Sequence, residues 1–448
     1  MRTTASPQPA PDDLLPQSLA AVAVRPGDRD YDAVRHTYTR LGSPAAVIRV
    51  RDQKDIADAL AHARTSQVPL TARSGGHGIS GRSTNDQGIV IDLAGLDAVE
   101  VVDARSGLVR VGAGARWGDV AAALAPHGLG LSSGDTGDVG VGGLATAGGI
   151  GLMSRLHGLT IDHMRAAELV LADGSLVRTD ADHDPDLFWA VRGAGANFGV
   201  ATAFEFQTDP VREVTAAVTV YDAADTAAFL TRWGAAVEAA PRAVTSFLTL
   251  VTGPGGGAVA QAMTVYAGTD PAAVGAALAP LLLAGPVLRN HAFVTPYHRL
   301  LPAGHGPQHA QQPLTVSRSG LVDHITEPTA EGIAALMGAA GMVQLRSIGA
   351  AVNDTPPTAM AYSHRTQNFS LMAATTPALR DDLDQRWEQL HSHLNGLYLS
   401  FETRTGRRQL NDAFPGTVLD RLIALKAYYD PEHLFDNNFA LPSAPFQH

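Results

Sequence analysis

The sequence predicts an α+β fold made of two domains. Its 448 residues exceed the length of one ordinary domain. Short strand-like and helix-like runs alternate from about residue 31 to 207, whereas longer strand-like runs and Ala-rich helices follow Pro210. With 45% apolar and 17% charged residues, the chain has the composition of a globular protein that buries a sizeable core. The change at Pro210 therefore indicates a second domain, in which we expect an antiparallel sheet.

In the first region, β-branched apolar runs between turn residues predict strands, and a capping residue before a periodic apolar face predicts a helix. The expected strands span residues 45–50, 68–72, 88–93, 99–102, 108–111 and 201–206. The expected helices span residues 52–66, with Asp52 as N-cap, and 117–125. We expect the strands at 99–102 and 108–111 to pair across the turn between them. An aromatic helix end at 186–192 leads into a glycine turn.

After Pro210 the expected elements are longer. The strands span residues 216–221, 246–251, 261–266 and 343–348, and the helices span 222–239, 271–283 and 329–337. Alternation in the strand at 343–348 places Gln344, Arg346 and Ile348 on one face. A final helix at 415–428 is expected before a polar tail.

Charge and composition exclude several classes of function. The net charge is −11 and the basic residues are scattered, so we expect no nucleic-acid partner. The absence of cysteine excludes disulfides, thiolate metal sites and cysteine nucleophiles. Residues 1–16 lack the apolar core of a signal peptide, and the apolar stretch 274–288 is too short and too interrupted to span a membrane. We therefore expect a cytoplasmic protein without a membrane partner, and no oligomeric state is predicted.

The segment from Thr71 to Gly78 places His77 in a glycine-lined turn directly after an apolar run. Glycines let the backbone approach a flat or phosphorylated ligand closely, and N–H groups in such turns form an anion nest. The imidazole is then held beside the ligand, where one ring nitrogen acts as ligand, base or nucleophile. A loop with a solvated histidine is the alternative interpretation.

A second glycine-rich segment spans residues 134–151, in which eight of eighteen residues are glycine. Gly140-Val141-Gly142 with Ala145 is reminiscent of a dinucleotide fingerprint, but the segment does not follow the first strand and is too glycine-rich to begin a good helix. We expect an extended loop whose N–H groups line a pyrophosphate and whose missing side chains admit a flat ring. A purely structural glycine loop is the alternative.

Two further segments complete a pattern of four separated motifs in a fixed order. They are the glycine turn that ends at Gly199 and Val200, and the segment from Tyr429 to Asn438. The four motifs together resemble the FAD-linked oxidases of the berberine bridge enzyme-like group, within the vanillyl-alcohol oxidase superfamily. The resemblance is strong over residues 45–206 and 420–442 and weak across the middle of the chain.

This resemblance implies a two-domain PCMH-type FAD-binding fold with an antiparallel-sheet substrate domain. The implied division of the chain is a flexible arm at 1–20, an FAD-binding domain at 21–208, a substrate-binding domain at 209–400 and a C-terminal segment at 401–448 that returns to the FAD domain. By similarity, His77 forms a covalent bond to the 8α-methyl carbon of the flavin. The other residues implied to hold FAD are Arg73, Ser74, Gly75, Gly76, Gly78, Thr136, Asp138, Val139, Gly140, Gly142, Gly143, Asp162, Gly199, Val200, Asn437 and Asn438.

Three positions in the second glycine-rich segment are informative against the family pattern, and two of them depart from it. Thr136 stands where many relatives carry a cysteine with a second flavin bond, so the resemblance implies a single covalent link. Such singly linked relatives include hydroxynicotine oxidases and antibiotic-tailoring oxidases, which favours a small substrate, a secondary metabolite, over an oligosaccharide. Val139 matches a position that controls oxygen access in the family, and a valine there goes with oxidase behaviour. Leu144 replaces a histidine common after the paired glycines.

Two residues are the catalytic candidates. Tyr398, in a segment that matches a family Tyr-x-Asn strand with Ser400 in place of the asparagine, is expected to be the base or the substrate anchor. A buried tyrosine that only satisfies its own hydroxyl is the alternative. Arg346 is expected to bind an acidic or carbonyl-bearing substrate, and a surface ion pair is the alternative. The dipeptide His364-Arg365 is interpreted as structural.

The leading functional hypothesis is an FAD oxidase that takes a hydride from a small organic molecule and passes electrons to molecular oxygen. The alternatives are a flavin dehydrogenase with another acceptor and a non-redox flavoprotein that acts as a cyclase or binding protein. A metal site is not expected, because the spacing of the histidines matches no ligand motif. These histidines are His291, His298, His305, His309 and His324.

Overall fold

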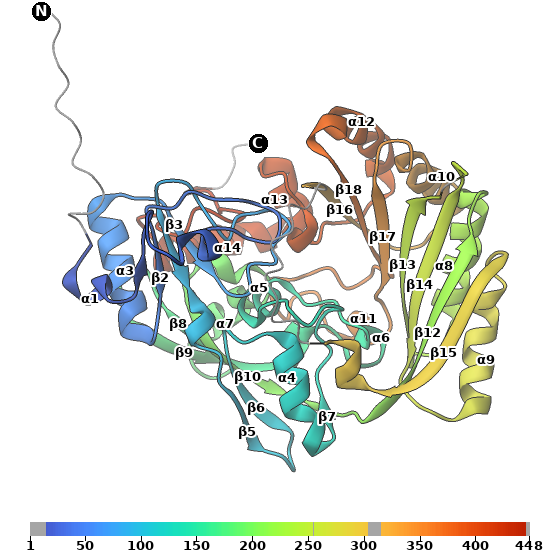
Figure 1. Cartoon of the computed structure of the whole chain (residues 1–448), viewed down its shortest axis with the longest axis horizontal. Helices are drawn as coiled ribbons and strands as arrows, with labels where there is room; N and C mark the ends of the chain where they lie inside the picture. Colours follow the sequence, from blue (N-terminus) through green and yellow to red (C-terminus); the bar gives the residue numbers. More distant parts are fainter. Residues whose placement is uncertain (1–14, 254, 303–314, 445–448) are drawn as a thin grey trace, which may run out of the picture.

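The computed structural model describes residues 15–253, 255–302 and 315–444. It confirms the α+β class, since helices combine with sheets that are almost entirely antiparallel. Sheets of four, five and two strands come from the first half of the chain, and a seven-stranded sheet comes from the middle. Figure 1 shows these two groups side by side, with the C-terminal helices back against the first group. His305 and His309 lie outside the described residues.

The four-stranded sheet carries the first glycine turn at the end of one of its strands. Its order is β1 (Ala23–Val24), β2 (Ala46–Arg49), β4 (Ile89–Asp92) and β3 (Leu70–Arg73). β4 pairs in parallel with β2 and β3, and α3 (Gln53–Ser66) connects β2 to β3. Asp52 caps α3 as predicted, because its side chain accepts a hydrogen bond from the Asp55 N–H. A short helix, α1 (Gln17–Ala20), precedes β1, and another, α2 (Tyr31–Val34), lies between β1 and β2 in the chain.

The five-stranded sheet is antiparallel and contains the predicted hairpin. Its order is β5 (Val99–Asp103), β6 (Leu108–Gly112), β10 (Val200–Gln207), β8 (Met164–Val170) and β9 (Leu176–Asp180). β7 (Leu129–Gly130) and β11 (Asp209–Pro210) form a separate short pair. The helices of this region are α4 (Trp117–Leu124), α5 (Val141–Ala147), α6 (Ser154–His157) and α7 (Pro185–Ala194).

The seven-stranded sheet has a layer of helices on its outer face. Its order is β15 (Val287–Pro296), β12 (Glu213–Asp222), β14 (Ala258–Tyr266), β13 (Val244–Thr252), β17 (Met342–Ser347), β18 (Phe369–Thr375) and β16 (Val316–Val322). The outer face is covered by α8 (Thr226–Ala239), α9 (Pro271–Leu282), α10 (Glu327–Leu336) and α12 (Arg380–Leu390) (Figure 1). Because side chains alternate along a strand, Leu248 packs under these helices while its neighbour Phe247 points to the inner face.

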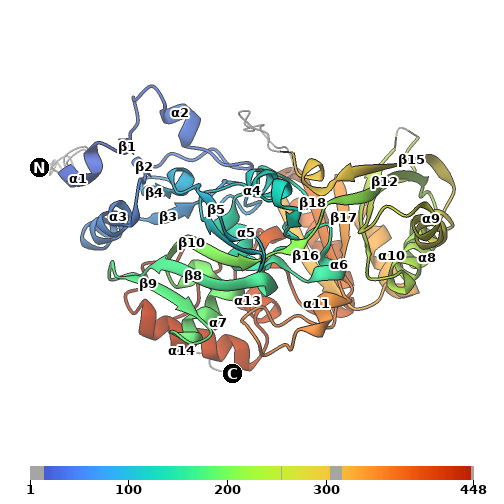
Figure 2. The same ribbon diagram turned by 90° about the horizontal axis from the view of Figure 1, so that it is seen from below.

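The C-terminal segment returns to the first group of sheets. After α11 (Ala351–Asp354) and α13 (Arg407–Ala413), α14 (Thr417–Tyr429) lies beside α7 under the five-stranded sheet (Figure 2). Phe435, Phe439 and Leu441 follow α14 and are buried in the same core as β6 and β10. The segment predicted to be a polar tail therefore supplies apolar core residues, because its alternate side chains pack against that core.

Two other expectations are corrected. Residues 17–20 do not belong to the arm predicted for residues 1–20, since they form α1 and Leu19 is fully buried in the core. The second glycine-rich segment is not loop throughout, because it contains α5. Tertiary contacts override the low helix propensity there: the N–H groups of Val141 and Gly142 donate to the Ala115 and Ala113 carbonyls, and Val141 is fully buried.

The two glycine-rich segments touch backbone to backbone. A Cβ added at Gly75 would overlap the backbone nitrogen of Gly140, and a Cβ added at Gly140 would overlap that of Gly75. Both positions therefore need glycine for space. The φ of Gly140 is −72°, a value that any residue adopts, so its backbone conformation alone does not require glycine.

We expect the substitution Gly140→Ala to lower the free energy of unfolding by about 3 kcal/mol, because the added methyl group forces the two loops apart. Gly143→Ala is the matched control in the same segment, since its Cβ would meet no atom within 4 Å. Urea unfolding of the two variants measures the difference. Equal stability of the two variants would contradict the tight backbone contact.

Candidate active site

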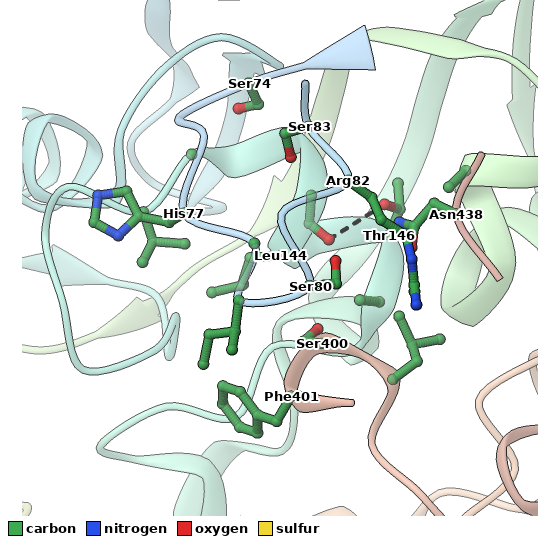
Figure 3. Close-up of a pocket in the computed structure, with 18 of the residues that line it drawn as sticks. Ser74, His77, Ser80, Arg82, Ser83, Leu144, Thr146, Ser400, Phe401 and Asn438 are labelled. Atoms are coloured by element: carbon green, nitrogen blue, oxygen red, sulfur yellow. Dashed lines mark hydrogen bonds between the residues drawn. The ribbon is translucent and has the colours of Figure 1, made fainter. Parts of the chain in front are cut away.

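One cavity of about 470 Å³ lies between the glycine-rich segments and the inner face of the seven-stranded sheet. Its volume falls in the range of about 300–1,000 Å³ typical of sites for small ligands and cofactors. Figure 3 shows Ser74, His77, Ser83, Leu144, Phe401 and Asn438 around it. The predicted site residues that line this cavity are Ser74, Gly75, Gly76, His77, Gly78, Thr136, Val139, Gly140, Gly142, Gly143, Gly199, Val200, Asn438, Arg346 and Tyr398.

Four predicted site residues do not line the cavity and instead support its walls. Arg73 is buried and pairs with Asp92 at 2.7 Å. Asp138 is buried and pairs with Arg116 at 3.1 Å. The other two are Asp162 and Asn437, whose contacts follow.

Asp162 holds the segment after α6 to the loop that precedes β18 of the seven-stranded sheet. It accepts from both terminal nitrogens of Arg365, at 2.7 and 3.0 Å, and from the Leu159 N–H at 2.8 Å. Asn437 donates to the Arg82 carbonyl at 3.0 Å and to the Thr71 hydroxyl. Both residues therefore connect segments that are distant in sequence, and Arg365 has the structural role predicted for it.

Ser74 ties the two glycine-rich segments to the hairpin β5–β6. Its hydroxyl donates to the Ala113 carbonyl at 2.6 Å and accepts from the Gly142 N–H at 3.3 Å. Both segments are held within hydrogen-bond reach of one side chain, and their backbones contact each other at Gly75 and Gly140. The cavity wall here consists of backbone with few side chains.

His77 is partly exposed at the cavity wall and stacks on Tyr38. The two ring centres lie 5.0 Å apart and the ring planes differ by 15°. Burial lowers the pKa of His77 below its ordinary value, while Asp138 opposes this shift. The imidazole is therefore neutral at pH 7, and a neutral ring keeps one nitrogen lone pair available as a nucleophile.

Tyr398 is buried on the opposite side of the cavity. Its hydroxyl accepts a hydrogen bond from the Gly149 N–H at 3.0 Å, and burial raises its pKa above the ordinary value. Gly148, at a φ of +146°, allows the close approach, because a Cβ there would lie 2.8 Å from the Tyr398 ring. The expected strand is not formed: Tyr398 precedes a 3₁₀ turn at Leu399–Phe401, which projects into the cavity rim instead of pairing with the sheet.

Arg346 lies on β17 with Gln344, and both line the cavity as the alternation predicts. Its Nη2 lies 3.1 Å from the Asp135 carboxylate, and its guanidinium carbon lies 4.3 Å from the ring centre of Phe401. The ion pair considered as the alternative role does form, but it lies in the cavity wall, since Arg346 is only 7% exposed.

The structure adds cavity residues that sequence reasoning missed. Arg82, Ser80 and Ser83 follow the His77 turn and line the cavity (Figure 3). The Arg82 guanidinium donates to the Thr403 carbonyl at 3.0 Å and to Asn438 Oδ1 at 3.4 Å, and burial lowers its pKa. In the sequence, Arg82 is a single arginine four residues after Gly78, among small and polar residues. Such a signal is too weak to identify a site residue without the fold.

The described histidines that were considered for a metal site, His291, His298 and His324, lie in the second region. His291 stacks on Phe293 along β15, and His324 pairs with Glu238 at 2.6 Å. Across residues 15–253, 255–302 and 315–444, no group of three or more His, Cys, Asp or Glu side chains could hold a metal ion. In the same part of the chain, no helix has the length and hydropathy needed to cross a membrane.

Comparisons with known proteins confirm the resemblance seen in the sequence. Residues 44–180 match the family described as FAD binding domain. Among curated proteins, (R)-6-hydroxynicotine oxidase of Paenarthrobacter nicotinovorans is 36% identical over 194 residues, which are 43% of this chain and 42% of that protein. The alignment thus spans less than half the length of this relative.

Solved structures share the whole fold at lower identity. Xylooligosaccharide oxidase from Myceliophthora thermophila has a TM-score of 0.85 at 24% identity, over 98% of this chain and 100% of that one. Glucooligosaccharide oxidase from Acremonium strictum, which carries a 6-S-cysteinyl, 8α-N1-histidyl FAD, has a TM-score of 0.82 at 21% identity, over 98% and 100% of the two chains. The chain therefore has the predicted two-domain, PCMH-type FAD-binding fold.

A buried histidine beside the Tyr398 segment makes stability depend on pH. His364 packs against Gly396 and its Nε2 lies 3.0 Å from the Ala413 carbonyl, and burial lowers its pKa to about 4. The unfolded chain binds a proton here below about pH 6.5, whereas the folded chain does not until about pH 4. Stability that is present above pH 6.5 is therefore lost as the pH falls toward 4.

We expect His364→Gln to remove about 2 kcal/mol of the stability loss between pH 7 and pH 5, because glutamine keeps the hydrogen bond without titrating. Urea unfolding at both pH values measures this change. His127→Gln, at an exposed site, serves as the control and should keep the wild-type pH dependence. An unchanged pH dependence in His364→Gln would contradict the assignment.

Proposed function

We propose that this protein is an FAD-dependent oxidase that takes a hydride from a C–H next to an O–H or N–H of a small organic molecule, a secondary metabolite. The observation that carries the proposal is the single cavity lined by His77, both glycine-rich segments and Tyr398. Bound FAD would accept the hydride and pass two electrons to O₂, which leaves as H₂O₂.

The cavity walls fit a flat cofactor that lies against backbone. Gly75, Gly140 and Gly142 line the cavity at places where loops meet without side chains. Gly143 also lines it, and a Cβ added there would meet no protein atom within 4 Å, so it would project into open space. These residues would hold FAD by close backbone contact, and Ser74 keeps their spacing through its two hydrogen bonds.

A single covalent link through His77 is part of this proposal. The lowered pKa of His77 supports it, because a neutral imidazole is the nucleophilic form. The cysteinyl bond of the glucooligosaccharide oxidase flavin has no counterpart here, since the chain contains no cysteine and Thr136 lines the cavity at the corresponding place in the motif. Arg73, Asp138, Asp162 and Asn437 would act on FAD through the residues they position.

Tyr398 is proposed to anchor the O–H or N–H of the substrate. Its raised pKa keeps the phenol protonated at neutral pH, which favours a hydrogen-bonding anchor over a free base. The Gly149 N–H already occupies one lone pair of the hydroxyl oxygen and fixes its position at 3.0 Å. The phenol, which keeps its own proton, would accept a hydrogen bond from the substrate O–H or N–H and orient it, and the substrate proton would pass to solvent as the hydride leaves. Val139, which lines the cavity, supports O₂ as acceptor through the family resemblance.

We expect purified wild-type protein to keep its flavin absorbance in the pellet after acid precipitation, because a covalent flavin cannot dissociate. His77→Ala should release any bound flavin to the supernatant. The absorbance spectra of pellet and supernatant measure both outcomes. Flavin in the supernatant of both proteins would overturn the covalent link, and no flavin in either, even after FAD is added, would overturn the function.

Tyr398→Phe should lower kcat by about 100-fold with unchanged flavin content, because loss of the hydroxyl removes the group that orients the reacting O–H or N–H, and misplacement of a reacting group costs factors of about this size. The matched control is Tyr362→Phe. Tyr362 is equally buried, its ring centre lies 6.3 Å from that of Tyr398, and its hydroxyl has no hydrogen-bond partner among the described residues. Assays with a panel of alcohols and amines, with oxygen uptake as readout, compare the two variants. An equal loss of kcat in the two variants would contradict the role of Tyr398. Flavin bleaching without oxygen uptake would favour a dehydrogenase.

A further inference from the structure

We propose that the substrate is a flat, mainly apolar alcohol or amine that also carries a neutral carbonyl, and that Arg346 receives this carbonyl. The inference rests on the proposed oxidase function and names the chemical class that the same cavity takes. Two observations carry it. One is the composition of the wall formed by the substrate sheet, and the other is the charge balance between Arg346 and Asp135.

The wall opposite the glycine-rich segments is largely apolar. Met342 on β17, Met372 on β18 and Phe401 in the 3₁₀ turn all line the cavity. Leu144 also lines the cavity, near Phe401 (Figure 3). Thioether and aromatic surfaces pack well against flat rings. A sugar would instead leave several hydroxyl groups against apolar atoms, and each buried hydroxyl without a partner costs free energy.

The polar groups of this wall are few. Gln344 lies on the same face of β17 and already donates to the Thr249 hydroxyl at 3.4 Å. Ser400 and Tyr398 come from the turn segment, and Tyr398 is assigned to the reacting O–H or N–H. Arg346 is therefore the strongest donor available for a second polar group of the substrate.

The charge of Arg346 is already balanced inside the protein. Asp135 Oδ2 accepts from Arg346 Nη2 at 3.1 Å and from Nε at 3.3 Å. A substrate carboxylate at this guanidinium would also approach Asp135, and two carboxylates close together repel each other. A neutral carbonyl oxygen accepts a hydrogen bond from the guanidinium without adding charge. The Arg346–Asp135 pair therefore favours a substrate with a neutral carbonyl over one with a carboxylate.

One nitrogen of Arg346 remains for this bond. Nη1 has no hydrogen-bond partner among the described residues and is shielded from solvent, and Arg346 as a whole is only 7% exposed. A buried donor without a partner is destabilising, typically by 1–3 kcal/mol. The ring centre of Phe401 lies 4.3 Å from the guanidinium carbon, and both residues line the cavity. The carbonyl reaches Nη1 by displacing this half-buried ring, so the flat ligand takes over the contact that Phe401 now makes.

Binding of matched probes to the purified holoprotein tests the inference without turnover. The probes are 2-acetylnaphthalene, 2-naphthoate and cellobiose, and isothermal titration calorimetry gives their Kd values. We expect 2-acetylnaphthalene to bind at least tenfold more tightly than 2-naphthoate, and cellobiose not to bind at millimolar concentration. Tighter binding of 2-naphthoate or of cellobiose would overturn the inference.

Two variants test whether the preference between the probes depends on the Arg346–Asp135 pair. Arg346→Met should raise the Kd of 2-acetylnaphthalene by about tenfold. The exposed control Arg105→Met should bind this probe with the Kd of the wild type. Asp135→Asn removes the balancing charge, so it should tighten 2-naphthoate binding by about tenfold and reduce the preference for 2-acetylnaphthalene by the same factor. This second variant keeps the test decisive where Arg346→Met does not fold. An unchanged preference in Asp135→Asn would overturn the charge argument.

The flavin spectrum of the same samples separates this inference from the proposed function. A protein that holds flavin but prefers 2-naphthoate would keep the oxidase proposal and overturn the substrate class. A protein without flavin, even after FAD is added, would overturn the oxidase proposal and the substrate class that rests on it.

Discussion

The backbone contact between Gly75 and Gly140 is the constraint on which the cavity depends. The turn that follows β3 and the loop that precedes α5 come from different parts of the chain, and they meet at a spacing that leaves no room for a Cβ on either side. Ser74 adds hydrogen bonds to Ala113 and Gly142 across the same junction. His77 and the start of α5 are thereby brought to one cavity, where backbone and not side chains forms the surface.

The second half of the site is attached to the first by buried polar contacts. Arg365 binds Asp162, Arg346 binds Asp135, and the Tyr398 hydroxyl accepts from Gly149. In each contact, a residue from the seven-stranded sheet or the segments that follow β17 binds a residue of the FAD-binding region at 44–180. Because buried charges are stable only when paired in good geometry, these contacts favour one orientation of the two sides. The position of Tyr398 relative to the glycine-rich segments is a consequence of that orientation.

Local patterns predicted most of the elements, and the failures have a common cause. The hairpin β5–β6, the Asp52 cap of α3 and the alternation along β17 depend on near neighbours in sequence. α5 was missed because its glycines have low helix propensity, and only contacts with Ala113 and Ala115 stabilise it. The burial of Phe439 was missed because much of the core that receives it comes from residues more than 200 positions away, such as those of β6 and β10.

By itself the sequence determined the types of chemical groups at the site: a histidine between glycines, loops without side chains, no cysteine, and a tyrosine near the end of the second domain. Their motifs are local, so order and spacing along the chain carry them. Only the tertiary structure decided which of these groups share the cavity, that Arg73 and Asp162 support it from outside, and that Asp135 neutralises Arg346. Such pairings depend on distances between segments that no local pattern encodes.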